Sequence, residues 1–214
     1  MKFITAYCHL RENICSVNGE IVSMRDNDSA DSWFKQIYKE QEFAYPKFYK
    51  MDVLSQAGFL TSELIKRANP GLITDYNDDE VAMLFANRSS SAETDLKFIH
   101  SYQHNGAPSP SLFVYTLPNI VMGEIAILNK WYGENLFAVL PGFNPDFYMN
   151  HCSILLSADS EAVLCSWLEV TGYQIDAFTF LIEKKGEKSI EFTKDTLSEL
   201  AELGGQQNKN YANY

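Results

Sequence analysis

Continuous apolar runs of strand length are the feature that most constrains the fold of this chain. Three of them occupy residues 81–86, 136–140 and 162–168, and helical segments lie between them. A strand that is covered by helices on both faces has an uninterrupted apolar sequence of this kind. The alternation of such strands with helices predicts a three-layer α/β fold around a mixed sheet.

Two helices are marked with particular clarity. Asp52 is a suitable N-cap for a helix over residues 53–67. Residues 120–131 carry only Glu124 and Lys130 as charged side chains, which predicts a helix buried almost all round. Shorter helices are expected at 32–39, 95–102, 147–156 and 196–203, and further strands at 2–8 and 177–182, the last a candidate for antiparallel pairing at an edge.

Charge and composition exclude several classes of partner. The chain of 214 residues has 28 acidic and 17 basic side chains and a formal net charge of −11, which would repel nucleic acid and anionic membranes. Its apolar runs fall short of the ~20 residues that span a bilayer, and the first residues do not resemble a signal peptide. Four scattered cysteines are expected to be reduced, buried thiols in a cytoplasmic protein: Cys8, Cys15, Cys152 and Cys165.

The sequence gives no support for a cofactor or a metal ion. It contains neither a glycine-rich dinucleotide fingerprint nor a phosphate-binding loop. His100 and His104 have the i, i+4 spacing of metal ligands, but Asn105-Gly106 follows at once and no third ligand is placed nearby. The acidic run 78–80 fits a solvated segment before a strand, so we expect no bound cofactor and no metal site.

The segment from Ser109 to Gly142 has the layout of a nucleophile scaffold. A buried helix and a short apolar strand lead onto a sharp corner at Pro141-Gly142, where α/β enzymes often place a nucleophile. The corner carries no Ser, Cys or Lys. His151 and Cys152 do not form a pair, because adjacent helical residues point about 100° apart. Composition and spacing therefore support no enzyme mechanism.

The order of these segments resembles the N-terminal half of a β-ketoacyl synthase, from about residue 1 to residue 183. Each stretch that carries the resemblance is short, but all follow the family's order. They are Lys50-Met51-Asp52 before a helix, the strand 81–86 with Arg88 to Ser91 after it, the stretch 109–126, Gly133-Glu134-Asn135 in place of a "G-P-N/S" turn, residues 161–165 in place of "A-D-V-M/L-A", and residues 177–182 in place of "A-A-F-L-V-L-E".

The resemblance implies half of a thiolase-like fold, three-layered, with a mixed and mostly parallel five-stranded sheet. The implied organisation is a ketoacyl-synthase N-terminal-like domain over residues 1–190, a C-terminal helical segment over 191–203 and a flexible tail over 204–214.

The resemblance also implies a lost activity. Counting forward from Gly133, the family's catalytic cysteine falls at Gly142, within Leu140-Pro141-Gly142-Phe143 where the family has "T-A-C-S/A". The two histidines that a ketosynthase uses for decarboxylation come from a C-terminal half to which no part of this sequence corresponds. Condensation needs a thiolate and groups that stabilise the enolate, so no independent activity is expected.

A partner is implied instead. The chain is similar to short, half-length ketosynthase-like subunits of aryl polyene and flexirubin-type systems, which act as chain length factors beside a full-length β-ketoacyl-ACP synthase. The implied interface comprises Leu136, Phe137, Val139, Leu140 and Asn119, and the implied gate of the partner's acyl tunnel comprises Leu112, Phe113 and Tyr115. Acyl carrier protein is acidic, so we expect it to dock on the partner rather than on a chain of net charge −11.

Two other functions remain open at this point. On the first alternative, the chain is a homodimeric module that binds an acyl chain or an acyl carrier. On the second, it is a thioesterase or acyltransferase that uses Ser89, Ser90 or Cys152 together with His100 or His151.

Overall fold

One mixed sheet runs through the described residues, which in this computed structural model are 1–105, 107–171, 174–186 and 189–211. Its strand order is β3-β2-β1-β7-β6-β4-β5, and β8 pairs with β1 beside this path. The strands are β1 (Phe3–Arg11), β2 (Ile14–Val17), β3 (Glu20–Met24), β4 (Val81–Asn87), β5 (Asn135–Val139), β6 (Ala162–Thr171), β7 (Gln174–Glu183) and β8 (Ile190–Glu191).

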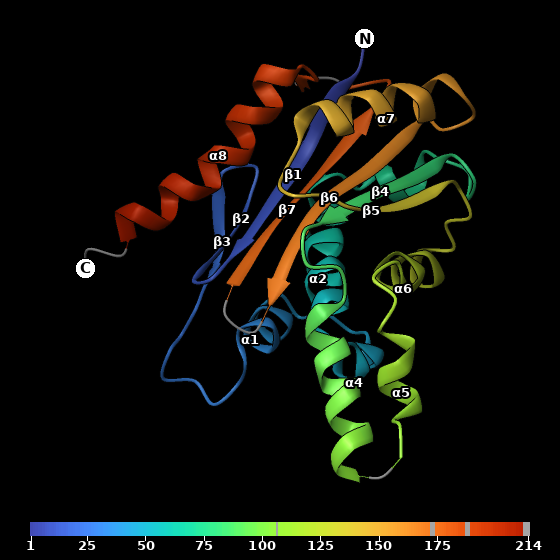
Figure 1. Ribbon diagram of the computed structural model, residues 1–214. Coiled ribbons are helices and arrows are strands. Elements are labelled where there is room, and N and C mark those ends of the chain that lie inside the picture. The colour runs from blue at the N-terminus through green and yellow to red at the C-terminus, as the bar shows by residue number, and fades with distance from the viewer. Residues whose placement is uncertain (106, 172–173, 187–188, 212–214) are drawn as a thin grey trace.

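Helices cover both faces of the sheet, so the three-layer α/β class is confirmed (Figure 1). One core lies between the sheet and the helices α1 and α2, and the other lies between the sheet and α7 and α8. The helices are α1 (Trp33–Glu40), the 3-10 helix η1 (Pro46–Lys50), α2 (Val53–Ala68), α3 (Gly71–Thr74), α4 (Ala92–Asn105), α5 (Pro110–Val114), α6 (Ile120–Asn129), α7 (Pro145–Ser157) and α8 (Lys194–Tyr211).

The sheet has more strands, and a smaller parallel share, than expected. Among the described strands, β4 pairs in parallel with β5 and with β6, and the remaining pairings are antiparallel. The predicted strand 177–182 belongs to β7, which is antiparallel as expected but lies between β1 and β6 rather than at an edge. Asn18-Gly19 forms the hairpin turn between β2 and β3, since both residues have the positive φ (50° and 87°) that a tight two-residue turn needs.

Helix α2 forms the base on which one face is built. The Asp52 side chain accepts a hydrogen bond from the Ser55 N–H at 2.9 Å, which confirms the predicted N-cap. Gly58 allows α6 to approach closely, because a Cβ atom on Gly58 would lie 2.3 Å from Val121 Cγ2. All seven residues of β4 are buried, as the apolar run predicted.

Helix α6 differs from its prediction. Only one side of it is buried, where Val121, Met122 and Ile125 pack against the core, and Ile127 is exposed. The expectation of a helix buried almost all round was therefore wrong. Its apolar sequence reflects a helix that packs against α2 along one side and leaves Ile127 exposed on the other. Glu124, in contrast, is buried.

Helix α8 is longer than expected. It continues through Tyr211, so residues 204–211 are helical where the sequence predicted a flexible tail, and residues 212–214 lie outside the described residues. Among the described residues, no helix combines the length and the apolar sequence that crossing a bilayer requires.

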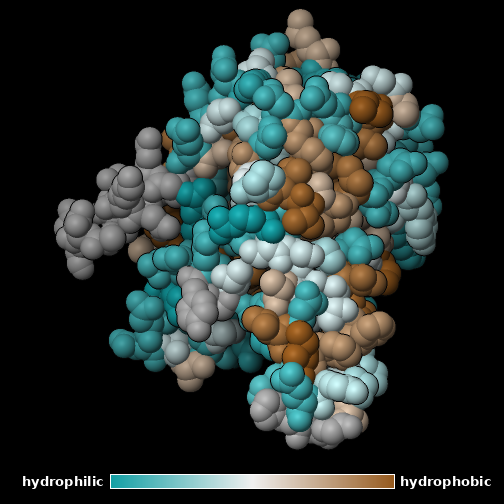
Figure 2. Space-filling view, in the orientation of Figure 1, coloured by the Kyte–Doolittle hydropathy of each residue, from teal (hydrophilic) through white to brown (hydrophobic). Residues whose placement is uncertain are grey.

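Helices α4 and α5 lie side by side and extend away from the sheet (Figure 1). Figure 2 shows hydrophobic side chains gathered over this pair. The exposed apolar residues on them are Leu96, Ile99, Tyr102, Phe113 and Val114.

Candidate functional site

The carboxyl ends of the three parallel strands β4, β5 and β6 bring the positions predicted from the sequence together at one end of these strands. The β4–β5 register places Asn87 opposite Val139, and the β4–β6 register places Ala86 opposite Trp167. The turn after β4, the corner after β5 and the end of β6 therefore lie next to one another. In open α/β sheets, ligand-binding and catalytic sites usually lie at the carboxyl ends of the strands.

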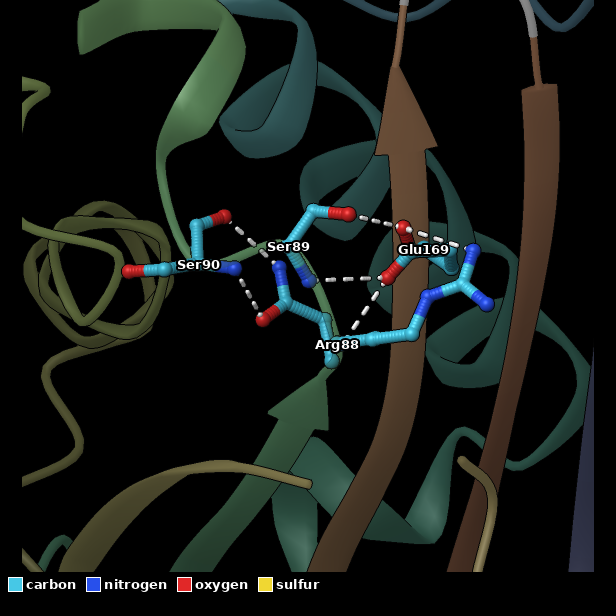
Figure 3. Close-up of polar contacts among 5 residues, drawn as sticks. Arg88, Ser89, Ser90 and Glu169 are labelled. Carbon is cyan, nitrogen blue, oxygen red and sulfur yellow. Dashed lines mark hydrogen bonds and ion pairs between the residues drawn. The ribbon is translucent and has the colours of Figure 1, made fainter. Parts of the chain in front are cut away.

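A buried carboxylate organises the turn after β4 (Figure 3). Glu169, on β6, accepts hydrogen bonds from the backbone N–H of Arg88 at 2.8 Å and of Ser89 at 3.2 Å, and from the Ser89 hydroxyl. The Arg88 guanidinium lies 3.8 Å from its other oxygen. Several donors thus compensate the burial of this charge. Glu169 is not among the residues singled out from the sequence, although a lone charge directly after the apolar run 162–168 was a usable signal.

The serines of this turn have structural partners. Asn87 accepts a hydrogen bond from the Ser90 N–H at 2.9 Å and donates one to the Ser90 carbonyl at 2.8 Å, which fixes Ser90 at a left-handed φ of 53°. The Ser91 hydroxyl donates to the Thr116 carbonyl at 2.7 Å. Hydrogen bonds of this kind, between side chains and backbone, are typical of an ordered polar turn.

Gly142 lies at the corner between β5 and α7, as predicted, but its backbone does not require glycine. The Leu140 N–H donates to the Asn87 carbonyl at 2.8 Å, which joins this corner to the turn after β4. Gly142 is not among the residues with positive φ, and a Cβ atom built on it meets nothing within 4 Å. Helix α7 starts three residues later, with the Asn144 side chain accepting from the Phe147 N–H at 3.2 Å. The corner thus has room for a side chain at the start of a helix.

The residues around the corner hold it rigidly. Phe143 packs against the rings of Tyr148, Trp167 and Phe178, with centroid distances of 5.3, 6.3 and 5.7 Å. The Tyr148 hydroxyl donates to the Ser166 carbonyl at 2.9 Å and ties α7 to β6.

The predicted alternative nucleophiles Ser89, Ser90 and Cys152, and the predicted base His151, each have structural contacts in the described residues. The Cys152 and Cys165 sulfurs lie 3.4 Å apart inside the core, and burial raises the pKa of the Cys165 thiol well above its ordinary value. His151 Nδ1 lies 2.9 Å from the Phe147 carbonyl oxygen, to which it donates. All four cysteines are free and buried, as expected. His100 is exposed on α4, and the His104 side chain lies outside the described residues.

Strand β5 forms one edge of the sheet, and its side chains divide into two sets. Leu136 and Val139 are 42% and 55% exposed. Phe137 packs against the α2 core and Leu140 against the α7 core. Asn119 is exposed immediately before α6.

The three predicted gate residues have different surroundings. Phe113 is 60% exposed and its ring lies 5.6 Å from that of Phe98 on α4. Leu112 is half-buried and lines an open apolar pocket beside α4. Tyr115 is buried, and its hydroxyl donates to Glu124 Oε1 at 3.0 Å. The prediction grouped the three, but only Phe113 is largely exposed.

Within the described residues, no three His, Cys, Asp or Glu side chains converge on a common point where a metal ion would sit.

Comparisons with known proteins find similarity at the level of structure. No protein-family model and no curated protein matches this chain. A chain in the ketosynthase ApeO in complex with its chain length factor ApeC from Xenorhabdus doucetiae matches with a TM-score of 0.60 and 15% identity, over 95% of this chain and 92% of that one.

Two further structures are similar. The ishigamide ketosynthase/chain length factor matches with a TM-score of 0.62 and 13% identity, over 88% of this chain and 63% of that one. AntDE:AntF, a type II PKS acyl-carrier protein in complex with its ketosynthase bound to the hexaketide, matches with a TM-score of 0.64 and 10% identity, over 86% of this chain. This chain spans 62% of the matched AntDE:AntF chain. It therefore has the thiolase-like fold found in ketosynthase/chain length factor complexes.

Proposed function

We propose that this chain is a non-catalytic ketosynthase-like subunit, a chain length factor, that pairs with a full-length β-ketoacyl-ACP synthase and shapes its acyl tunnel. The observation that carries the proposal is the apolar edge strand β5, on which Leu136 and Val139 are exposed. An open apolar edge strand is a site of association, because its backbone groups and side chains can continue the sheet into another chain.

The corner at Gly142 supports a role without covalent chemistry. Its position before α7 suits a nucleophile, since the N-terminus of a helix stabilises a thiolate. The backbone there accepts a side chain without strain, yet the residue is glycine. A subunit with this corner presents the scaffold of a condensing site without the group that holds the acyl chain.

Phe113 is the residue that we assign to the partner's tunnel. It is the largely exposed member of the predicted gate, and it lies on a helix pair that extends away from the sheet. A bulky aromatic at the floor of a tunnel would limit chain length by occupying space. The pathway we propose is polyene, polyketide or fatty-acid-like biosynthesis in the cytoplasm. Acyl carrier protein docks on the partner, because this chain is itself strongly acidic.

Co-expression with a full-length ketosynthase from the same gene neighbourhood tests the proposal. We expect a stoichiometric complex that Leu136→Lys abolishes, because a lysine on the edge would be buried without a partner. Ile73→Lys is the matched control, since Ile73 is also exposed but lies on α3, away from β5. Phe113→Ala in the intact complex should lengthen the product.

Other outcomes would support the rival functions. The same edge can pair with a second copy of this chain, so a stable homodimer that ignores the ketosynthase would favour the homodimeric binding module. Turnover of acyl thioesters by the isolated chain, lost in Ser90→Ala or Cys152→Ala, would favour a thioesterase or acyltransferase.

A further inference from the structure

We propose that the contact Tyr115–Glu124–Lys47 positions helix α5, so that Phe113 is held in one direction; the use of that direction for limiting chain length rests on the function proposed above. The three residues come from separate parts of the chain: Tyr115 follows α5, Glu124 lies on α6 and Lys47 lies on η1.

Helix α5 cannot hold its own position. None of its residues, Pro110 to Val114, is buried. Against α4 it has the contact between the rings of Phe113 and Phe98, the half-buried Leu112, and a hydrogen bond of 3.3 Å from the N–H of its N-cap residue Ser109 to the Ser101 hydroxyl oxygen. A five-residue helix is also too short to be stable by itself in water. These contacts lie on its α4 side and at its start, so its direction also depends on what holds its C-terminal end.

Tyr115 supplies the connection at the C-terminal end of α5. It is the C-cap residue, its ring is buried, and its hydroxyl donates to Glu124 Oε1 at 3.0 Å. Burial and the hydrogen bond to Glu124 both raise the pKa of the Tyr115 phenol, which therefore remains a donor at neutral pH. A hydrogen bond from a buried phenol to a carboxylate is of the stronger, charge-assisted kind.

Glu124 is in turn fixed to the body of the protein. Its second oxygen, Oε2, lies 2.6 Å from Lys47 Nζ. Lys47 precedes Phe48, which is fully buried, and α6 packs closely against α2 where Val121 meets Gly58. A buried carboxylate on an otherwise apolar helix is costly unless it is paired. Here the pairing joins η1, α6 and the end of α5.

A second contact lies next to the first. The Thr116 carbonyl accepts a hydrogen bond at 2.7 Å from Ser91, which is itself buried in the turn after β4. Residues 115 and 116 are thus held by two different elements of the body, and Phe113 lies two residues before them on the exposed side.

Amide hydrogen exchange of the isolated full-length chain tests the positioning role without any partner. In Tyr115→Phe, which keeps the ring, we expect exchange over residues 107–118 to become about tenfold faster, while exchange in α2 stays unchanged. Lys47→Met should also speed up exchange over this segment, whereas Lys47→Arg, which keeps the positive charge, should leave exchange slow. Ser111→Ala is the matched control, since its hydroxyl lies 3.0 Å from that of Ser109 within the same exposed segment. No acceleration in Tyr115→Phe, or an acceleration spread equally over α2, would overturn the inference.

Product analysis in the complex with the ketosynthase separates this inference from the proposed function. Phe113→Ala should move the product distribution to longer chains, whereas Tyr115→Phe should broaden it about the same mean, because Phe113 is retained but less well held. If the exchange result holds and neither variant changes the products, the positioning role stands and the tunnel-shaping function fails. If Phe113→Ala lengthens the products while Tyr115→Phe changes neither exchange nor products, the function stands and the positioning role fails.

Discussion

The two edges of the sheet are treated in opposite ways. At the β3 edge the chain covers itself: the Gln41 side chain donates to the Val22 carbonyl at 3.0 Å, and the Ser23 hydroxyl donates to the Glu40 carboxylate. Both partners come from the end of α1. At the β5 edge the strand pairs with β4 on one side only, and Leu136 and Val139 are exposed on opposite faces of the sheet.

The difference indicates which edge is available for association. A free edge strand invites pairing with other chains, and proteins usually cover it with side chains, loops or charges. This chain does so at β3 with Gln41 and Glu40, although Met24 is exposed there, whereas no described residue makes a comparable contact with the outer side of β5. The β3 edge is therefore covered by the chain itself, and we infer that the β5 edge is covered by a partner.

The largest expected effect comes from placing the same charge on each edge. Val139 on β5 is 55% exposed and Met24 on β3 is 51% exposed, so they form a matched pair. Val139→Lys should weaken the complex with the ketosynthase by about 100-fold, whereas Met24→Lys should leave it unchanged. Light scattering and titration calorimetry of the purified chains give both values. Equal losses in the two variants would show that the edges do not differ in function.

The next effect concerns the packing of α6, the helix that precedes β5, against α2. Gly58→Ala should destabilise the protein by about 1–3 kcal/mol, because the added methyl group would meet Val121 and push α6 away from α2. The control is Gly123→Ala on α6, where a Cβ atom meets nothing within 4 Å, and where we expect a gain of about 0.5–1 kcal/mol. Urea unfolding monitored by circular dichroism measures both changes. A Gly58→Ala variant as stable as the wild type would contradict the close packing of α2 and α6.

A smaller effect should follow from uncovering the β3 edge. Gln41→Leu removes the donor to the Val22 carbonyl and should cost about 1 kcal/mol of unfolding free energy. It should also make the isolated chain more prone to self-association, which sedimentation velocity detects. Gln103→Leu, at an exposed position on α4, controls for the added apolar surface. If the two variants behave alike, the Gln41 contact does not protect the edge.

The smallest effect is expected at the corner beside β5. Gly142→Ser should change the unfolding free energy by no more than about 0.5 kcal/mol, because its backbone is ordinary and its Cβ position is open. Thermal and urea unfolding provide the test. A loss of several kcal/mol would show that glycine is required by the fold at this position, and would remove the argument that chemistry rather than geometry explains it.

Local sequence predicted much of the fold, because the signals concerned are local. The buried strand β4, the Asp52 cap of α2 and the corner at Gly142 follow from short-range composition and spacing. The Asn18-Gly19 hairpin turn is equally local, since this residue pair favours the positive φ values of a two-residue turn. The position of β7 could not be obtained in this way, since a continuous apolar run does not reveal which strands lie on either side of it.

In the candidate site, too, some residues were recognisable from the sequence, whereas the contacts between distant segments were not. The family resemblance singled out Gly142, the apolar strand 136–140 and Phe113, whose roles stay predictions, and the sequence showed Glu124 as a charge on an apolar helix. It did not foresee that Glu124 joins Tyr115 to Lys47, or that Glu169 holds the turn at Ser89. These contacts span up to 80 residues of sequence, and no spacing within a segment encodes them.

By itself, then, the sequence determined the α/β class, the absence of a nucleophilic side chain at the corner and the apolar character of β5, because composition and short-range periodicity carry these properties. Only the tertiary structure decided that β5 is an uncovered edge while β3 is covered, and that Tyr115 faces inward while Phe113 faces outward. The physical reason is that exposure and charge pairing depend on which distant segments meet, and the energy of burying a charge such as Glu124 is settled by a partner 77 residues away.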